Sequence, residues 1–504
     1  MPRFFALLFF NQINHQNIAA FSIAISCFLF IESAIELPRR STIRTSGHSG
    51  SSRSVCHLPQ IDPWDDSIKS YIYKAPPLNC STVPVQFYIE QNDDQWGSLI
   101  LKGQNLDRVQ CRFCPVTRID DFQIVFNQNW QEIKAFPFTD WPDEVDFIQI
   151  SCQAKDGKEF TDIFSNIKRT LDTDAELGTK WNIVMLGIDS MSRLNAIRQI
   201  PETLKKLHEH GGIILKGHNK VGENTFPNVV GMLTGERTEV DQGQPYPGAL
   251  EHDGSTGRSY DNYPFIWKKF AQSGYKTMYA EDMPSIGTFQ WQRAGFKQQP
   301  TDHYGRTMWV AMEKMKPLEA LFDPLLLILE NRKIHLTKHN SLCFNQRPKF
   351  VMQWNYAVKQ MIKAHSGRVP FFIFSWLVEL GHDHANDFQL ADSELVRILD
   401  WYFENNFNKR TFFFLISDHG SRVDSIRNTL TGRIEDRLPF FSVIVPDEFK
   451  QEYPQFFKNL QVNSNRLTTH FDIYHTLQHI LCLSNPSQCE AEGKGFFFKL
   501  SFFI

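Results

Sequence analysis

Two acidic residues end apolar segments of the sequence that have the character of buried strands. Asp189 closes NIVMLGID, and Asp418 closes FFFLISD, with His419 and Gly420 directly behind it. An acid in this position either caps the following turn or helix or acts as a metal-binding or catalytic carboxylate. Because open parallel sheets bind ligands outside the carboxyl ends of their strands, two such acids with an adjoining histidine favour a functional site.

Thr225 adds a hydroxyl group that could act as a nucleophile. It precedes a helical segment in GENTFPNVVGMLTGE, where a threonine can serve as a plain helix cap. The same place puts the hydroxyl beside the N–H groups of a helix N-terminus, which favour a phosphate or another anion. A metal or a base must lower the pKa of such a hydroxyl before it attacks. Aspartate and histidine side chains suit Zn²⁺ or Mn²⁺, so these residues are chemically consistent with a metal-centred nucleophile.

The elements that would position these residues alternate between strand and helix after residue 180. Periodic segments predict helices over residues 194–210 and 387–405, and near-continuous apolar segments predict buried strands. The strand segments are WNIVMLGID, PFFIFSWLVEL, RTFFFLISDHG and LPFFSVIVP, and a last helix is expected in FDIYHTLQHIL. This alternation predicts an α/β domain over residues 176–484, with a mostly parallel sheet covered by helices on both faces.

The residues before 176 predict three further parts of the chain. Residues 18–31 are apolar or small, so residues 1–37 are expected to be a signal peptide or a signal anchor. Residues 38–55 are rich in Ser, Arg, Thr and Gly, which predicts a flexible linker. Short apolar segments such as VPVQFYIE, WGSLILKG and DFIQISCQA predict a small β-rich accessory domain over residues 56–175.

Cysteine usage indicates an oxidising compartment. Apart from Cys27 in the apolar segment, eight cysteines are disulfide candidates: Cys56, Cys80, Cys111, Cys114, Cys152, Cys343, Cys482 and Cys489. Five of them fall in residues 56–175, so at least one pairs outside the accessory domain or stays free. A set of buried free thiols is the alternative. Asn79 begins an N-glycosylation sequence, which fits secretion or anchoring in the secretory pathway.

The charge balance excludes one class of partner. The chain has 53 Lys and Arg against 56 Asp and Glu, so it lacks the basic field that drives nonspecific nucleic-acid binding. Nucleic acid is therefore not expected as a partner. The sequence leaves the oligomeric state open.

Several segments resemble a known superfamily and, more narrowly, one family. Asp189 in GIDSMSRLN, Thr225 in HNKVGENTFPN, and Asp418 and His419 in SDHGSRVDSIRNTLTGRIEDRLP resemble the alkaline phosphatase superfamily. Together with YAEDMPSIGTF and LTTHFDIYHTL, they are similar to the animal family called domain of unknown function 229. The resemblance implies an alkaline phosphatase-like α/β/α sandwich. It also implies that one divalent metal lies among Asp189, Thr225, Asp418 and His419, with Thr225 as the nucleophile.

The resemblance gives less support to a second metal. Phosphodiesterases of the superfamily place an Asp four residues before a His, and here Val378 occupies the Asp position before His382. One metal is therefore favoured, with His382 contacting substrate, in an arrangement similar to the lipoteichoic acid synthase and phosphoethanolamine transferase branches. The candidates for a second metal or for substrate contact are His382, Asp383 and His470, with Glu379, His384 and Asp387 as further acids and histidines nearby.

Other polar residues near the nucleophile are candidates for substrate binding. Asn228 and His218 could contact an oxyanion, or they could be a turn amide and a loop histidine. Arg422 is the arginine nearest to His419 and could hold phosphate oxygens bidentately. The alternative for the arginines of this segment is pairing with neighbouring acids on the surface: Arg422, Arg427, Arg433 and Arg437 with Glu435 and Asp436.

These features predict a secreted or membrane-anchored metal-dependent hydrolase or transferase. Its substrate would be a phosphoester in a small molecule, a glycan or a lipid headgroup. A sulfatase of the same fold would need a Cys or Ser where Thr225 stands, so sulfate-ester hydrolysis is disfavoured. An inactive extracellular binding protein on this fold is the other alternative. Residues 485–504, which end in GKGFFFKLSFFI, form an atypical tail that suggests a truncated terminus.

Overall fold

The structure of the chain is a computed structural model. It describes residues 58, 60–80, 86–91, 98–168, 181–238, 240–241, 244–245, 259–315, 342–485 and 502–503, all within one compact unit over Leu58–Ile504. The predicted signal or anchor segment, the linker, Cys56 and Cys489 lie outside the described residues. Among the helices of the described ranges, none is long and apolar enough to cross a membrane.

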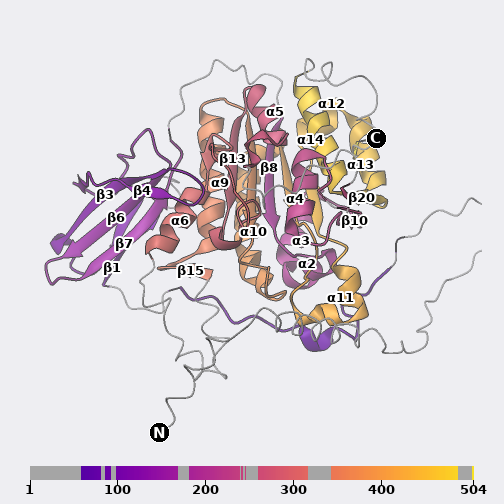
Figure 1. Cartoon of the computed structure of the whole chain (residues 1–504), viewed down its shortest axis with the longest axis horizontal. Coiled ribbons are helices and arrows are strands. Elements are labelled where there is room, and N and C mark those ends of the chain that lie inside the picture. Colours follow the sequence, from indigo (N-terminus) through magenta and orange to yellow (C-terminus); the bar gives the residue numbers. More distant parts are fainter. Residues whose placement is uncertain are drawn as a thin grey trace, which may run out of the picture. The chain divides into compact units, whose positions relative to one another are not determined.

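A seven-stranded sheet lies at the centre of the α/β part of the chain (Figure 1). Its strands follow the order β14, β13, β17, β8, β18, β19, β9. The first five run parallel, whereas β19 is antiparallel to β18 and β9 is antiparallel to β19. The bounds are β8 Asn182–Ile188, β9 Ile213–Ile214, β13 Lys276–Glu281, β14 His303–Tyr304, β17 Phe371–Leu377, β18 Thr411–Ile416 and β19 Phe441–Ile444. The predicted mostly parallel sheet is confirmed, and its four predicted strands are β8, β17, β18 and β19.

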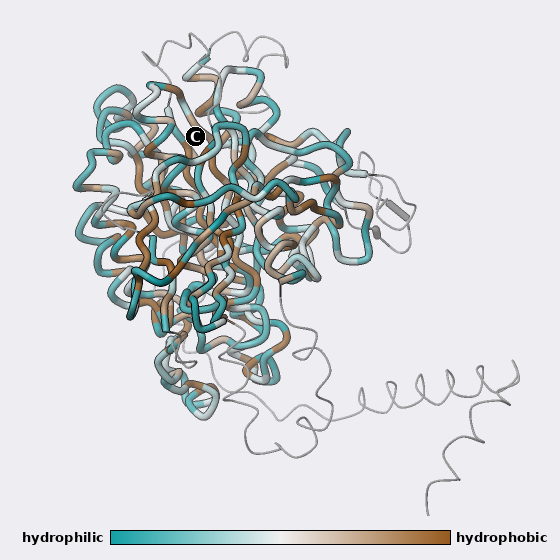
Figure 2. The backbone as a smooth tube through the Cα atoms, turned by 90° about the vertical axis from the view of Figure 1, so that its left-hand side faces the viewer, coloured by the Kyte–Doolittle hydropathy of each residue, from teal (hydrophilic) through white to brown (hydrophobic). Residues whose placement is uncertain are grey.

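Helices cover both faces of this sheet. Alternate residues of β8 pack into two separate apolar cores, Val184, Leu186 and Ile188 into one, Ile183 and Met185 into the other. The helices of the first core are α2 Arg193–Gln199, α3 Pro201–Glu209, α6 Arg306–Met315, α9 Lys349–Ser366 and α10 Asp392–Glu404. Those of the second are α4 Thr225–Thr234, α5 Ile266–Gln272, α12 Asp447–Glu452, α13 Pro454–Asn463 and α14 His470–Ser484. Figure 2 shows the hydrophobic segments running through the interior between these layers.

The helix predicted over residues 194–210 is divided in the structure. α2 ends at Gln199 and α3 begins at Pro201. Proline lacks the N–H that would continue a helix and suits the first turn of a new one, so the prediction of one continuous helix is wrong at this residue. The segment 387–405 also begins with a 3₁₀ helix, Asp387–Ala391, before α10. Neither α6 nor α9 was predicted from the sequence.

The strands described within residues 86–91 and 98–165 all pair in antiparallel fashion. One pair joins β1 Phe87–Gln91 and β2 Leu99–Gly103. A five-stranded sheet contains β3 Val109–Arg118, β4 Ile124–Phe126, β5 Gln131–Ile133, β6 Phe147–Ala154 and β7 Glu159–Ser165. The helix α6 lies against β3 and β7, so this sheet packs on the α/β part. The prediction that this region is rich in β-strands is confirmed. The boundaries of an accessory domain stay a prediction.

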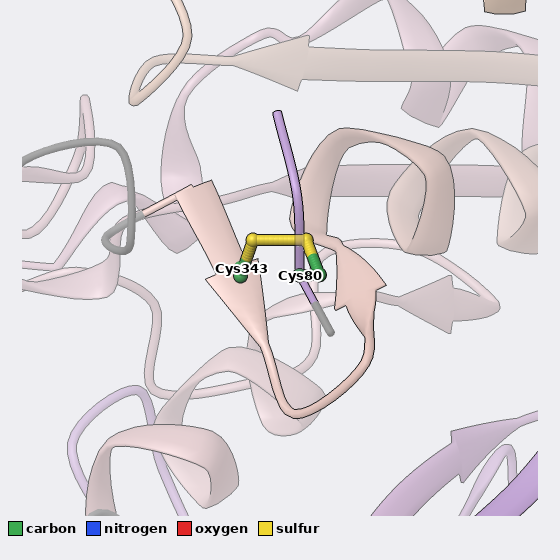
Figure 3. The surroundings of a disulfide bond; sticks show 2 residues. All are labelled: Cys80 and Cys343. Carbon is green, nitrogen blue, oxygen red and sulfur yellow. A yellow bond between two sulfur atoms is a disulfide. The ribbon is translucent and has the colours of Figure 1, made fainter. Parts of the chain in front are cut away.

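Two disulfides tie this region together and to the rest of the unit. Cys111 and Cys152 are directly opposite each other on β3 and β6 and are bonded. Cys80 is bonded to Cys343 in the short strand β15 Cys343–Phe344, 263 residues further along the chain (Figure 3). Five cysteines in residues 56–175 predicted that at least one would pair outside this region or stay free. The bond between Cys80 and Cys343 confirms this prediction. Cys482 is disulfide-bonded as well.

Cys114 corrects the list of disulfide candidates, because it is a free, buried thiol. It lies three residues beyond Cys111, so its side chain points to the opposite face of β3. Its cross-strand neighbour is Gln149, whose Oε1 lies 3.7 Å from the sulfur. Burial raises the pKa of this thiol to about 11, which keeps it protonated and inert.

The tail predicted to be atypical contributes two residues to the core. Phe502 and Phe503 are buried in the same apolar core as α13 and α14. Their backbone carbonyl groups accept hydrogen bonds from Asn463 and Asn459 of α13. These two residues therefore pack as core residues, although the sequence around them is unusual.

Candidate active site

The carboxyl ends of two neighbouring strands bring the predicted acids together. β8 and β18 pair in parallel register, and the pairing runs to Ile416 opposite Gly187. Asp189 follows β8 directly, and Asp418 follows β18 after Ser417. Both carboxylates are buried and lie at the same edge of the sheet.

The four residues predicted to surround one metal, Asp189, Thr225, Asp418 and His419, meet at this edge. Asp189, Asp418 and His419 each offer one ligand atom, and these atoms lie within 4.8 Å of one another. Nε2 of His419 is 3.1 Å from Oδ2 of Asp418 and 4.0 Å from Oδ1 of Asp189. Oγ1 of Thr225 is 3.1 Å from Oδ2 of Asp189 and 3.5 Å from Nε2 of His419. In the described ranges, no other three His, Cys, Asp or Glu residues gather in this way.

The hydrogen bonds of His419 show which ring nitrogen carries the proton and which has a free lone pair. Nδ1 lies 2.8 Å from the carbonyl oxygen of Gly420, which can only accept, so Nδ1 carries the proton. Burial lowers the pKa of His419, which favours the neutral ring. Nε2 is then an acceptor, and it lies close to the carboxylates of Asp418 and Asp189.

The two oxygens of Asp418 have unequal surroundings. Oδ1 accepts from the backbone N–H groups of Ser190 and His419 and from the hydroxyl of Ser417. Oδ2 is buried and has no hydrogen-bond donor among the described residues. It lies 3.1 Å from Nε2 of His419, so two acceptors lie close together with no hydrogen bond between them.

A divalent cation fits this arrangement. Burial, and after it the charge of Asp418, raises the pKa of Asp189 well above its ordinary value, so the two acids repel each other when both are ionised. A cation would offset this repulsion and would satisfy Oδ2 of Asp418 and Nε2 of His419 at once. Two carboxylates, one imidazole and one hydroxyl are a donor set that suits Zn²⁺ or Mn²⁺.

Thr225 reaches the acids from the first residue of α4. Its side chain is half-buried, and a loop of residues 220–224 leads into the helix. The side-chain amide of Asn228 closes this loop: Oδ1 accepts from the N–H groups of Val221 and Gly222, and Nδ2 donates to the carbonyl groups of Gly222 and Asn224. Asn228 therefore holds the loop that positions Thr225.

This placement corrects the role that the sequence suggested for Asn228. All its amide hydrogen-bonding capacity in the loop is used, and the side chain is fully buried, so it cannot contact a substrate oxygen. The turn-amide alternative is the one that the structure supports.

The structure places His218 and His470 behind the site, away from its open side. β10 Gly217–Asn219 pairs with β20 Leu467–Thr469, which sets the two rings 4.8 Å apart, centroid to centroid. Nε2 of His470 donates to the carbonyl group of Asp418, and Nδ1 accepts from Nε2 of His218. Thr468 then donates its hydroxyl proton to Nδ1 of His218. Both nitrogens of each ring are used, so neither histidine has a lone pair left for a metal or an N–H group left for an oxyanion.

Ser190 is a site residue that the sequence argument missed. Its hydroxyl donates to Oδ1 of Asp189 over 2.6 Å, and its N–H donates to Oδ1 of Asp418. To do both, it adopts a left-handed backbone conformation with φ of 67°, which is uncommon for a residue with a side chain. The only available signal was its place directly after the strand acid.

A cavity of about 340 Å³ opens in front of Thr225 and Asp189. Ile286, Trp291 and Val378 give it an apolar wall, and Trp291 is 49% exposed. Arg293 also lines it and stacks on the ring of Phe226, 3.9 Å from the centroid. None of the residues 286–293 was singled out as a site residue, because nothing in the sequence brings this loop to Thr225.

His382 and Arg422 line the same cavity, as candidates for substrate contact would. Nδ1 of His382 is 2.8 Å from the exposed carboxylate of Asp383. Val378 is buried in the wall, so this side offers no acid in the place where a second metal would need one. The suggested pairing of the arginine segment is found in part: Asp436 pairs with Arg427 and Arg437. Asp436 also binds Lys220, and Glu435 binds Arg198 instead of an arginine of the segment.

Comparison with known families supports the resemblance seen in the sequence. The family described as "Protein of unknown function (DUF229)" matches residues 74–496, which include every residue of the candidate site. The chain belongs to this family. No curated protein matches the chain in sequence.

Solved structures that are similar to this DUF229 chain share little of its sequence. The C-terminal periplasmic domain of EcEptC from Escherichia coli, in complex with Zn, is 14% identical with a TM-score of 0.37, over 60% of this chain and 83% of that one. A protein in the alkaline phosphatase superfamily from Vibrio parahaemolyticus is 13% identical, with a TM-score of 0.38 over 62% and 72%. The lipoteichoic acid synthase LtaP from Listeria monocytogenes is 12% identical, with a TM-score of 0.34 over 56% and 69%. Similarity at this level transfers neither a substrate nor a catalytic residue.

Proposed function

We propose that this DUF229 chain is a metal-dependent hydrolase or transferase of phosphoesters, with Thr225 as its nucleophile. The observation that carries the proposal is a close pair of hydrogen-bond acceptors. Oδ2 of Asp418 and Nε2 of His419 lie 3.1 Å apart, and no donor lies between them. The hydroxyl of Thr225 lies within hydrogen-bonding distance of the same cluster and at the mouth of a cavity.

The geometry supports the following chemistry. A divalent cation held by Asp189, Asp418 and His419 would lower the pKa of the Thr225 hydroxyl and neutralise charge on the phosphoryl oxygens. Asp189 accepts the hydrogen bond of this hydroxyl, so its carboxylate can take up the proton as Oγ1 attacks. Oγ1 then forms a bond to phosphorus while the bond to the leaving oxygen breaks in line with it. The leaving oxygen takes up a proton from solvent, and water or an alcohol, losing its own proton, later attacks phosphorus and releases Oγ1 of Thr225.

Two groups around the nucleophile suit the developing charge. The N-terminus of α4, a ten-residue helix, begins at Thr225 itself and favours negative charge beside the hydroxyl. Arg422 lines the cavity and can donate to phosphoryl oxygens. We assign one metal to this site because Val378 replaces the acid that a second metal would need, and we assign His382 to substrate contact.

The cavity wall indicates the class of substrate. Trp291 and Ile286 offer apolar surface next to Arg293 and Arg422, so a phosphoester with an apolar or sugar part fits better than a bare phosphate. This agrees with a phosphorylated small molecule, a glycan or a lipid headgroup. The disulfides favour an oxidising compartment, which supports an extracellular location or one in the secretory pathway.

The proposal is tested with the full chain loaded with Zn²⁺ or Mn²⁺ and bis(p-nitrophenyl) phosphate as the substrate. Thr225→Ala is expected to reduce turnover on the order of 10³-fold or more, because the nucleophile is lost. Thr225→Ser keeps a hydroxyl and is the matched control that retains part of the activity. Equal turnover of wild type and the folded Ala variant would contradict the proposal, and transfer to an added alcohol would distinguish transferase from hydrolase.

A further inference from the structure

We propose that a second pocket next to the nucleophile cavity binds another oxyanion of the substrate, a phosphate or sulfate ester. This arginine pocket is lined by Arg422, Asp424, Arg427, Asn428, Arg433 and Arg437 and has a volume of about 360 Å³. The inference rests on the proposed function, since it names a feature of the substrate that Thr225 would attack.

Arg422 joins the two cavities. It lines the nucleophile cavity together with Thr225 and Asp189, and it lines the arginine pocket as well. Its Nε is buried and has no hydrogen-bond partner among the described residues. A substrate that extends from Thr225 past Arg422 would therefore enter the arginine pocket.

The arginines of the pocket are incompletely neutralised by the protein. Within the described part of the chain, neither Arg422 nor Arg433 has a carboxylate within 4.0 Å. Arg427 lies 3.7 Å from Glu223 and donates to Asp436 over 3.3 Å, and Asp436 is also 3.9 Å from Arg437. Its carboxylate is fully buried, however, and both of its oxygens already accept from Nζ of Lys220.

The one acid that lines the pocket is engaged elsewhere. Asp424 accepts from the backbone N–H groups of Ala385 and Ile426, which makes it the cap of a 3₁₀ turn. Its oxygens are thus held by the backbone, and among the described residues it forms no ion pair with an arginine of the pocket. Arg437 is further oriented by donating to the carbonyl group of Arg433 over 2.9 Å.

Guanidinium groups bind tetrahedral oxyanions through paired N–H donors, and four of them around one pocket suit a phosphate or sulfate ester. Because Arg422 is shared, we infer a substrate with two anionic groups, one on either side of this residue. The scissile phosphoester lies at Thr225, and the second group stays unreacted in the arginine pocket.

The test measures anion binding directly. Inorganic phosphate and inorganic sulfate are each titrated calorimetrically into the metal-loaded full chain, into Arg433→Gln/Arg437→Gln, and into Arg108→Gln, which changes an exposed arginine elsewhere. Arg433 and Arg437 are exposed, so the double variant is expected to fold, which circular dichroism verifies. The arginine-pocket site should weaken about tenfold or more in the double variant and not in Arg108→Gln.

The outcomes separate this inference from the proposed function. A double variant that binds both anions as wild type does would overturn the inference. An active Thr225→Ala variant refutes the nucleophile and leaves anion binding at the arginine pocket intact. Tighter binding of sulfate identifies a sulfate ester as the second group, and tighter binding of phosphate identifies a phosphate ester.

Discussion

His419 and His470 are both fully buried near the carboxyl end of β18, and their rings have different surroundings. Each ring donates one N–H to a backbone carbonyl group, His419 to Gly420 and His470 to Asp418. The second nitrogen of His470 accepts from His218, whose own second nitrogen accepts from Thr468. The second nitrogen of His419 faces a carboxylate oxygen that has no donor among the described residues.

This difference separates a structural histidine from a functional one. A buried polar network whose members are all satisfied stabilises the fold, and the His218–His470 pair belongs to this kind. Two buried acceptors that lie together without a cation lower the stability of the metal-free protein. Binding of a metal ion offsets this loss of stability. The comparison predicts opposite effects for substitutions at the two histidines.

The largest expected effect is on turnover in His419→Ala. Removal of this ring takes away one of the three ligand atoms, so metal-loaded protein should lose activity on the order of 10³-fold. Turnover of bis(p-nitrophenyl) phosphate at saturating metal measures the loss. A His419→Ala variant with wild-type turnover would show that His419 has no role in catalysis.

The next effect is on stability in His470→Ala. This change leaves the carbonyl group of Asp418 and the N–H of His218 unsatisfied and creates a cavity, so unfolding should require about 2–5 kcal/mol less. Metal affinity should fall less than in His419→Ala, about 10- to 100-fold, because His470 only supports the backbone of a ligand. Urea unfolding and metal titration of the two variants give both numbers. If His470→Ala had unchanged stability and lost all its metal, His470 would be a functional histidine and not a structural one.

Asp282 extends the comparison to a buried carboxylate that accepts from backbone N–H groups, those of Val378 and Glu379. Burial first, and then the charge of Glu379, raises the pKa of Asp282 to about 8, against the lowering effects of Val378 and Lys349. Glu281 raises it further. Since this value lies above the ordinary 3.8, the contribution to stability is fully present below about pH 4 and is lost as the pH rises toward 8.

The last expected effect is a pH dependence of stability that Asp282→Asn removes. Wild type should lose stability relative to this variant as the pH rises, by up to about 1.4 kcal/mol for each pH unit between about pH 4 and pH 8. Urea unfolding of both proteins across this range measures the difference. Parallel stability curves would show that Asp282 does not titrate in this window.

The sequence predicted the parts of the site that depend on strand ends. Asp189 and Asp418 follow uninterrupted apolar strands, and Thr225 precedes a clear helix, so the topology of a parallel sheet brings them to one edge. The sequence also carried the signal that the predicted helix over residues 194–210 is divided at Pro201, where a new helix begins. That signal was available in the chain itself.

The sequence could not predict which polar groups the fold would satisfy. His218 and His470 lie 252 residues apart and meet only because β10 pairs with β20. Asn228 resembled a substrate contact until its four hydrogen bonds to the preceding loop were known. Likewise, nothing in the spacing of the arginines shows that Asp436 is already held by Lys220 from 216 residues away.

The most direct test of the metal centre is the metal content of the purified full chain after equilibration with Zn²⁺ or Mn²⁺ and removal of free ion. Wild type is predicted to retain about one equivalent, and Asp418→Asn, folded by circular dichroism, to retain almost none. A folded wild-type chain that retains no metal, or an Asp418→Asn variant that retains as much as wild type, would contradict the account.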